Sequence, residues 1–315
     1  MKILLILIVT LVCVAVVFIA LTYPRFHREM RTAQDHLLAG SEVLKAEHGD
    51  IEYAVKGEGT PVLLVHGAGG GYDQGLWYGE VSLGRGYKFI SVSRYGFLRS
   101  SIPENPSIKT QAALYKDLLD YLRIEKVVVI GASAGGPSAM QFANDYPDRC
   151  SALILLSAVS MTRAQGDKAP LYVNIIHLIQ QSDYVYWLFA KFFQSTILNL
   201  MGVPSNVYQS FTVQEKELSQ EMLDIMHPMS RRYKGTINDG RMLELGSVST
   251  SNITAPTLIV HAKDDALVSY SHAENAHKNI KQSKLIPFDT GGHAMLSQMD
   301  KVKGCVKEFL KDISR

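Results

Sequence analysis

Short apolar runs alternate with amphipathic stretches along most of the chain after residue 40. Runs such as residues 62–65 and 127–130 are wholly apolar, which is typical of strands that are covered on both faces of a sheet. Between such runs, apolar positions recur at helical spacing. Strands are expected at residues 42–46, 51–56, 62–65, 87–92, 127–130, 152–156, 257–260 and 284–288. Helices are expected at residues 74–83, 110–122, 136–146, 271–279 and 295–310.

This alternation predicts an α/β fold. Strands that alternate with helices of about ten or more residues form right-handed crossovers and a mostly parallel sheet. The first two expected strands have a turn but no helix between them, so they form an antiparallel edge. We therefore expect a mostly parallel eight-stranded sheet flanked by helices, built from residues 41–160 and 249–315.

Residues 161–248 interrupt the alternation and predict a helical cap insertion over one end of the sheet. A polar stretch with a helical pattern occupies residues 214–226, after a cluster of aromatic residues. These aromatic side chains could line a tunnel for an apolar acyl chain or touch a membrane. Packing within the cap itself is the more common role of such residues. The cluster comprises Tyr184, Tyr186, Trp187, Phe189, Phe192 and Phe193.

The chain begins with an uncharged apolar run, residues 3–22, which is long enough to cross a bilayer as one helix. A cleavable signal peptide is the alternative, but its apolar region is usually about 7–15 residues long and ends at a small-x-small site. Ala20 and Thr22 match such a site poorly. We expect residues 1–23 to form an uncleaved single-pass membrane anchor and residues 24–40 a charged tether.

The orientation of this anchor stays open. Lys2 precedes the apolar run, whereas Arg25, Arg28 and Arg31 follow it. Lys and Arg are enriched on the cytoplasmic side of membrane spans, which favours a cytoplasmic catalytic part. However, the N-terminal tail is too short for this comparison to decide the side of the membrane.

Composition narrows the classes of function. Of the 315 residues, 32 are Lys or Arg and 30 are Asp or Glu, and the two signs are interspersed. Without a basic stripe, nucleic acid is not an expected partner. The three cysteines, Cys13, Cys150 and Cys305, show neither metal-ligand spacing nor a disulfide framework. We therefore expect no metal or organic cofactor, and the oligomeric state stays open.

The strongest chemical signal is at residues 131–135, which read glycine-alanine-serine-alanine-glycine. The pattern alone is weak, because an ordinary glycine-rich β–α turn can produce it. Here it directly follows a buried-strand pattern and opens an expected helix, which is the setting of a nucleophile elbow. Only small residues fit around so tight a turn, and the turn exposes the serine Oγ at the carboxyl edge of the sheet. Ser133 is therefore the candidate nucleophile.

A second loop of small residues, residues 66–71, directly follows another expected strand. Backbone N–H groups of such a loop can form an oxyanion hole together with the N–H of Ala134. A phosphate-binding loop fits poorly, because no Lys-Ser or Lys-Thr pair follows and the dinucleotide spacing is imperfect. We expect His66 to orient this loop rather than to take part in catalysis.

An acidic residue and a histidine each follow a later expected strand. Asp265, next to Asp264, lies just past one strand, and His293 lies in a glycine-bearing loop past the next. A serine hydroxyl needs a base to take its proton, and the base needs a carboxylate on its other nitrogen. Because the carboxyl ends of parallel strands meet at one edge, we expect Ser133, Asp265 and His293 to converge there.

Together these motifs resemble those of the α/β-hydrolase fold family, and the likeness covers most of residues 41–315 apart from the insertion. Family members that open epoxides or cleave carbon–halogen bonds have an aspartate in place of Ser133, so the resemblance excludes those reactions. One departure is the turn at residues 93–100, which lacks the aspartate that the family often has there. That turn is structural in the family, so the departure concerns the subfamily more than catalysis. The matching motifs are residues 66–67, 131–135, 265–268 and 292–293.

The resemblance also assigns roles. Family members usually place the acid three residues before a valine, which favours Asp265, before Val268, over Asp264. The implied enzyme is a serine hydrolase that forms an acyl-enzyme and needs no cofactor. The implied catalytic residues are Ser133, Asp265 and His293, with the backbone N–H groups of Ala68 and Ala134 as oxyanion donors.

We expect hydrolysis of a carboxylic ester or thioester of a small or apolar acyl group. Acyl transfer to an alcohol or to peroxide stays open, as does carbon–carbon bond hydrolysis of a diketone-like substrate, because both use the same serine framework. A ligand-binding protein without turnover is a third alternative. The complete set of Ser133, Asp265 and His293 argues against it. The expected partners are a small-molecule acyl substrate and a membrane.

Overall fold

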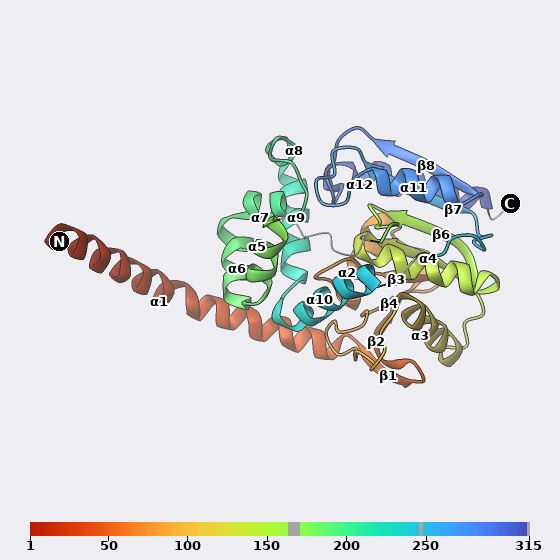
Figure 1. Ribbon diagram of the computed structural model, residues 1–315, viewed down its shortest axis with the longest axis horizontal. Coiled ribbons are helices and arrows are strands. Elements are labelled where there is room, and N and C mark those ends of the chain that lie inside the picture. Colours follow the sequence, from red (N-terminus) through yellow and green to blue (C-terminus); the bar gives the residue numbers. More distant parts are fainter. Residues whose placement is uncertain (163–170, 246–247, 314–315) are drawn as a thin grey trace. The chain divides into compact units, whose positions relative to one another are not determined.

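The computed structural model describes residues 1–162, 171–245 and 248–313. The chain divides into two compact units, Met1–Ala39 and Gly40–Arg315 (Figure 1). Parts of the predicted cap, residues 163–170 and 246–247, lie outside the described residues.

The N-terminal unit is one helix, α1 (Lys2–Ala39), which carries the apolar run and the charged stretch after it without a break. Among the described residues, α1 alone is long and apolar enough to cross a membrane, and none of its apolar window is buried. A signal sequence meets the same criteria of length and composition. The helix is therefore a candidate membrane span.

The second unit is built on an eight-stranded sheet with the order β1-β2-β4-β3-β5-β6-β7-β8. Strand β2 pairs antiparallel with β1 and with β4, whereas all neighbours from β4 to β8 are parallel. This confirms the predicted α/β fold with a mostly parallel eight-stranded sheet and an antiparallel edge. The strands are β1 (Glu42–Ala46), β2 (Gly49–Lys56), β3 (Thr60–Val65), β4 (Tyr87–Val92), β5 (Val127–Ala132), β6 (Cys150–Leu156), β7 (Thr257–Ala262) and β8 (Ser283–Phe288).

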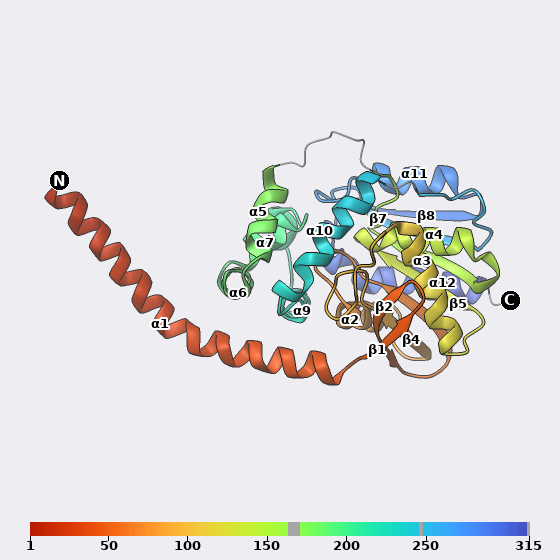
Figure 2. The ribbon, with the colours of Figure 1, turned by 60° about the horizontal axis from the view of Figure 1, so that its bottom comes forward.

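Helices cover both faces of this sheet (Figures 1 and 2). Strand β5 shows why its sequence is apolar throughout: Val127 and Val129 belong to the core on one face, and Val128 and Ile130 to the core on the other. The first face is covered by α3 (Ile108–Tyr121), α4 (Gly136–Asp145) and α11 (Ser271–Asn279). The second face is covered by α2 (Tyr72–Ser82) and α12 (Met299–Ile313).

The chain between β6 and β7 forms a group of helices, α5 to α10, which we call the cap (Figure 2). The cap packs closely on loops that follow strands β3 and β4. A Cβ atom on Gly69 would lie 2.7 Å from Cε of Met226, and one on Gly96 would lie 3.0 Å from Cα of Gly235. The cap therefore covers the carboxyl edge of the sheet. Its helices are α5 (Leu171–Gln180), α6 (Asp183–Phe192), α7 (Gln194–Leu200), α8 (Ser205–Gln209), α9 (Val213–Ile225) and α10 (Ser230–Leu245).

The aromatic cluster of the cap divides between burial and exposure. Trp187 is fully buried and Tyr186 is 2% exposed, whereas Phe192 and Phe193 are 47% and 54% exposed. Packing within the cap therefore accounts for Trp187. The two phenylalanines at the end of α6 leave much of their rings on the surface.

The closing helix begins later than the apolar pattern predicts. Met295 has a φ of +49°, a left-handed conformation that an α-helix of L-residues does not propagate. A 3₁₀ turn, Leu296–Gln298, follows it, and α12 starts at Met299. Met295 thus belongs to the loop that carries His293.

Candidate active site

Ser133 sits at the turn between β5 and α4, with a φ of +49°. This left-handed conformation is strained for a residue with a side chain. A Cβ atom at Gly135 would lie 2.5 Å from the carbonyl oxygens of Val65 and His66, so no larger residue fits there. The carbonyl of Ser133 also accepts a hydrogen bond of 2.9 Å from the Val159 N–H. Steric crowding and this bond hold the serine in its strained position.

His293 lies between this serine and Asp265. Its Nε2 is 2.9 Å from Ser133 Oγ, and its Nδ1 is 2.8 Å from Asp265 Oδ2. Because an ionised carboxylate can only accept, Nδ1 carries the proton, and Nε2 faces the hydroxyl as an acceptor. The structure thus brings the three sequence-predicted side chains into one line of contacts. In this arrangement the hydroxyl proton can pass directly to the imidazole.

The carboxylate of Asp265 is held by four groups. Oδ1 accepts the N–H groups of Leu267 and Val268, both at 2.9 Å, and Oδ2 lies 3.1 Å from Nε2 of His261 as well as against His293. Burial by itself raises the pKa of Asp265, but the facing His293, the bonds from both imidazoles and the Val268 N–H hold that pKa well below its usual range. The acid therefore stays ionised in its buried position.

Asp264, the rival acid in the sequence, has a different task. Its carboxylate accepts hydrogen bonds from Thr290 Oγ1 at 2.7 Å and from the Gly292 N–H at 2.8 Å. These bonds brace the loop just before His293. Of the two neighbouring acids, Asp265 therefore contacts the imidazole and Asp264 shapes the loop that presents it.

Gly202, in the turn after α7, contacts this site, and the sequence patterns did not reveal it. Its carbonyl accepts the His293 N–H at 3.0 Å. The residue has a φ of +82°, and a Cβ on it would lie 2.6 Å from Cβ of Leu267. A glycine after a helix signals only a helix end. The contacts of Gly202 with Leu267 and His293, which lie far along the chain, could therefore not be predicted from the sequence. The sequence also offered no indication that His261 is a second partner of Asp265.

The loop at residues 66–71 passes directly against the nucleophile. A Cβ on Gly67 would lie 3.0 Å from Cβ of Ser133. Gly67 O accepts the Gly70 N–H at 3.3 Å, and Gly69 between them has a φ of +69°. This turn requires glycine because a left-handed residue stands at its centre. Ala68, the residue between Gly67 and Gly69, is exposed.

The two predicted oxyanion donors come from segments that adjoin the serine. Ala68 belongs to the loop that touches Ser133, and Ala134 directly follows the serine in the 3₁₀ turn that opens α4. The first N–H groups of a helix have no acceptor within the helix, which leaves the Ala134 N–H available to a ligand. The placement suits an oxyanion hole, and the role of both residues stays a prediction.

His66 braces the loop, as expected. It is fully buried, and its Nε2 accepts the backbone N–H of Arg94 at 3.0 Å. Its Nδ1 therefore carries the proton and donates to Gly67 O at 2.6 Å. Burial, and then the charges of Arg94 and Arg232, lower the pKa of His66 well below its usual value. The imidazole is thus a neutral part of the loop.

A cavity of about 170 Å³ opens beside Ala68. An apolar cavity of about 150 Å³ can hold a benzene molecule, so this one has room for a ring or for a chain of similar size. Among its lining residues, Gln180 is a buried polar side chain whose Oε1 has no partner within the part of the chain that the structure describes. Most of the wall is aliphatic and includes Ile176, Ile179, Ile197, Leu200, Met226 and Met229.

Over residues 1–162, 171–245 and 248–313, no group of three His, Cys, Asp or Glu side chains is arranged to hold a metal ion. The chemistry that the described residues place at the site is that of a hydroxyl, an imidazole and a carboxylate.

Comparison with known proteins agrees with this architecture. Residues 60–298 match the sequence profile of the alpha/beta hydrolase fold. The uncharacterized hydrolase YcgS of Bacillus subtilis is 30% identical over 261 residues, which cover 80% of this chain and 91% of that protein. A 2-hydroxy-6-oxo-6-phenylhexa-2,4-dienoate hydrolase of Comamonas testosteroni is 26% identical over 273 residues, 83% of this chain and 91% of that protein.

Solved structures share the fold at lower identity. An esterase from Exiguobacterium antarcticum superimposes with a TM-score of 0.66 at 23% identity, covering 86% of this chain and 99% of that one. This similarity concerns the fold alone.

The lowered pKa of Asp265 predicts a pH-dependent effect of Asp265→Asn on stability. Because the folded pKa is depressed, the carboxylate stabilises the fold fully above the ordinary Asp pKa of about 3.9. That stabilisation is lost as pH falls below this value toward the folded pKa. The free energy of unfolding, measured by urea denaturation between about pH 3 and pH 7, should therefore differ most between wild type and variant above pH 5. A difference that stays constant or grows at acid pH would contradict the assignment.

Proposed function

The chain belongs to the alpha/beta hydrolase fold family, and on this premise we propose that it is a serine hydrolase that cleaves a carboxylic ester or thioester of a small or apolar acyl group. The observation that carries the proposal is the line of contacts from Ser133 through His293 to Asp265. The aliphatic cavity beside Ala68 supports an apolar acyl group.

In the proposed first step, Ser133 Oγ attacks the substrate carbonyl while His293 Nε2 takes the hydroxyl proton. Asp265 keeps Nδ1 protonated and stabilises the imidazolium that forms. The negative charge on the carbonyl oxygen is stabilised by the N–H groups of Ala68 and Ala134. The C–O or C–S bond then breaks, and His293 returns its proton to the leaving alcohol or thiol.

In the second step a water molecule attacks the acyl-serine ester. His293 Nε2 takes one proton from the water and later gives it to Ser133 Oγ, so that the acid is released and the enzyme is regenerated. The same donors stabilise the second oxyanion. An alcohol or peroxide in place of water would give acyl transfer instead.

Carbon–carbon bond hydrolysis is the second candidate, and the 26% identical relative from Comamonas testosteroni favours it. The substrate in that enzyme's name is a dienoate, which is a carboxylate. A buried carboxylate requires a cationic or donor-rich pocket. Among the described residues no Lys or Arg lines the cavity beside Ala68, and although His177, Gln180 and Thr236 contribute polar groups, most of the wall is aliphatic. Because an aliphatic wall suits an apolar acyl group better than a carboxylate, we favour an ester or thioester.

We also propose that α1 anchors the enzyme to a membrane as a single pass. The proposal is supported by the length of the uncharged run and by the exposure of its aliphatic side chains. Near the two ends of the run, for example, Ile3 is 76% exposed and Leu21 is 75% exposed. Such a surface is stable in hydrocarbon and costly in water.

The nucleophile assignment predicts the behaviour of Ser133→Ala. Removing the hydroxyl should lower kcat on p-nitrophenyl esters by several orders of magnitude, about 10⁴-fold or more, with the fold intact. A panel of nitrophenyl esters and vinylogous diketones, measured on wild type and variant, separates the two candidate reactions. A fluorophosphonate should label wild type at Ser133 and leave the variant unlabelled. Near-normal ester cleavage by the variant would overturn the assignment, and well-folded wild type without labelling would favour a binding protein.

The cavity predicts that Ile179→Trp shortens the preferred acyl chain. Ile179 is 6% exposed in the cavity wall, and the larger indole should fill the space that a hexanoyl chain needs. The ratio of kcat/KM for p-nitrophenyl hexanoate to that for the acetate should fall by about tenfold or more. Leu178→Trp, on the neighbouring residue that is 67% exposed, is the matched control and should leave the ratio unchanged. An unchanged ratio in Ile179→Trp would show that the acyl chain lies elsewhere.

The anchor predicts that the whole chain stays with the membrane. After alkaline carbonate extraction the protein should pellet with the bilayer, and its mass should correspond to the full 34.9 kDa chain. Recovery of a shortened soluble protein that begins after the apolar run would instead identify a cleaved signal peptide.

A further inference from the structure

Arg94, in the turn after β4, is buried and makes several contacts with the loop at residues 66–71. Its Nε donates to His66 O at 2.8 Å and its Nη2 to Gly67 O at 3.1 Å. Its backbone N–H donates to His66 Nε2 at 3.0 Å. The side chain is 1% exposed and its guanidinium lies 4.8 Å from the ring centre of Phe97. One residue therefore holds both the backbone and the imidazole of this loop.

The carbonyl that Arg94 holds is part of the peptide bond that carries the Ala68 N–H. This peptide is trans and planar, so its C=O and N–H point in opposite directions. Fixing the direction of Gly67 O consequently fixes the direction of the Ala68 N–H. A cationic donor on the carbonyl oxygen also draws electron density from the amide and makes its N–H a stronger donor.

Arg94 is itself held by the cap. Asp239 of α10 is buried and accepts from Arg94 Nη1 at 2.5 Å and from Nη2 at 2.7 Å. The same helix packs on the turn after β4 by direct backbone approach, since a Cβ on Gly235 would lie 2.2 Å from the Phe97 ring. The Leu98 N–H donates to the Arg231 carbonyl at 3.0 Å. The carboxylate that fixes the guanidinium therefore moves with α10.

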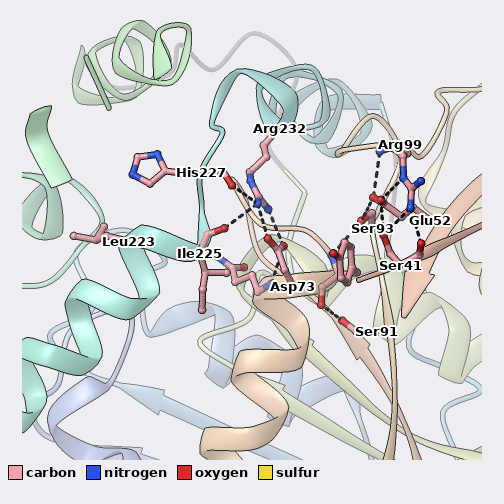
Figure 3. Close-up of polar contacts among 12 residues, drawn as sticks. Ser41, Glu52, Asp73, Ser91, Ser93, Arg99, Leu223, Ile225, His227 and Arg232 are labelled. Atoms are coloured by element: carbon pink, nitrogen blue, oxygen red, sulfur yellow. Dashed lines mark hydrogen bonds and ion pairs between the residues drawn. The ribbon is translucent and has the colours of Figure 1, made fainter. Parts of the chain in front are cut away.

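In a second ion pair between cap and core, the arginine belongs to the cap and the aspartate to the core. This arginine does not donate to the carbonyls of the loop. Arg232 of α10 donates to both oxygens of Asp73 in α2, at 2.9 and 2.6 Å, and to the carbonyls of Ile225 and His227 (Figure 3). Like Arg94, Arg232 is fully buried. Its hydrogen bonds go to α2 and to the cap's own backbone. This pair attaches the cap beside Gly71, at the end of the loop, and none of these hydrogen bonds reaches the Gly67–Ala68 peptide.

We propose that Arg94 is a positioning residue that orients and polarises the Gly67–Ala68 peptide as an oxyanion donor, and that Asp239 makes this orientation depend on the seating of the cap. The proposal rests on the proposed serine hydrolase function. It gives the turn at residues 93–100, which departs from the family pattern, a role at the site. A cap displaced from the sheet would withdraw the carboxylate from Arg94 and loosen the donor peptide.

The experiment compares Arg94→Lys, Asp239→Asn and Asp239→Glu in the full chain, on an ester that wild type cleaves. Lysine keeps the charge but loses the planar set of donors. We expect kcat to fall by about 100-fold in Arg94→Lys, as for a small misplacement of a catalytic group, with little change in KM. Asp239→Asn should lower kcat by about tenfold, and Asp239→Glu, which restores a carboxylate, should lower it less.

Affinity for a transition-state analogue gives the second readout. The inhibition constant of a trifluoromethyl ketone with the same acyl chain should rise by the factor by which kcat/KM falls, because its oxyanion uses the same donors. Asp73→Asn is the matched control, since it breaks a buried cap-to-core pair of the same kind. It should lower the melting temperature and leave kcat and analogue affinity close to wild type.

The outcomes separate this proposal from the proposed function. Wild type that neither cleaves esters nor reacts with a fluorophosphonate refutes the function itself. Active wild type whose Arg94 and Asp239 variants lose only stability, or behave like Asp73→Asn, refutes the positioning role alone. If Arg94→Lys does not fold, as judged by circular dichroism, the two Asp239 variants carry the test, because they keep Arg94 in place.

Discussion

The contact between Ser133 Oγ and His293 Nε2 depends on a property of parallel sheets, namely that their strands all end at the same edge. Strands β5, β6, β7 and β8 are neighbours in the sheet, in this order, and each pair is parallel. The residues that follow them are therefore delivered side by side although they are distant in sequence. The hydroxyl comes from the end of β5, the carboxylate from the end of β7 and the imidazole from the end of β8. A different strand order would separate these groups, whatever their sequence motifs.

The helices of the cap do not merely lie over this contact, because they also form hydrogen bonds with the residues around it. Gly202 O accepts the N–H of His293, and Asp239 accepts hydrogen bonds from Arg94, which also donates to Gly67 O in the loop at residues 66–71. These contacts come from two separate parts of the insertion, one from the turn after α7 in its middle and one from α10, its last helix. The insertion also supplies most of the aliphatic wall beside Ala68. The wall of the cavity beside Ala68 and the contacts to the loops around Ser133 and His293 are thereby supplied by the same group of helices.

Local sequence was sufficient where a residue's conformation is determined by its immediate neighbours. Small residues around Ser133 and glycines in the loop after β3 were readable, because a tight turn excludes larger side chains. The strands were readable because burial on both faces requires a continuous apolar run. The start of the last helix was misplaced by a few residues, since the left-handed Met295 has no local signal in the apolar pattern. The catalytic roles of Ser133, Asp265 and His293 stay a proposal, although the structure places the three side chains in contact.

The sequence by itself determined the α/β fold, the apolar N-terminal helix and the residues from which a hydrolase site could be assembled, because each rests on periodicity or on short-range steric limits. The resemblance favoured Asp265 over Asp264, and the tertiary structure shows that Asp265 contacts the imidazole. Only the tertiary structure revealed that Gly202 supports His293 and that Arg94 joins the loop at residues 66–71 to Asp239. Such contacts unite residues that lie far apart in the chain, and hydrogen bonds at that separation depend on how the helices and strands pack, which no local pattern encodes.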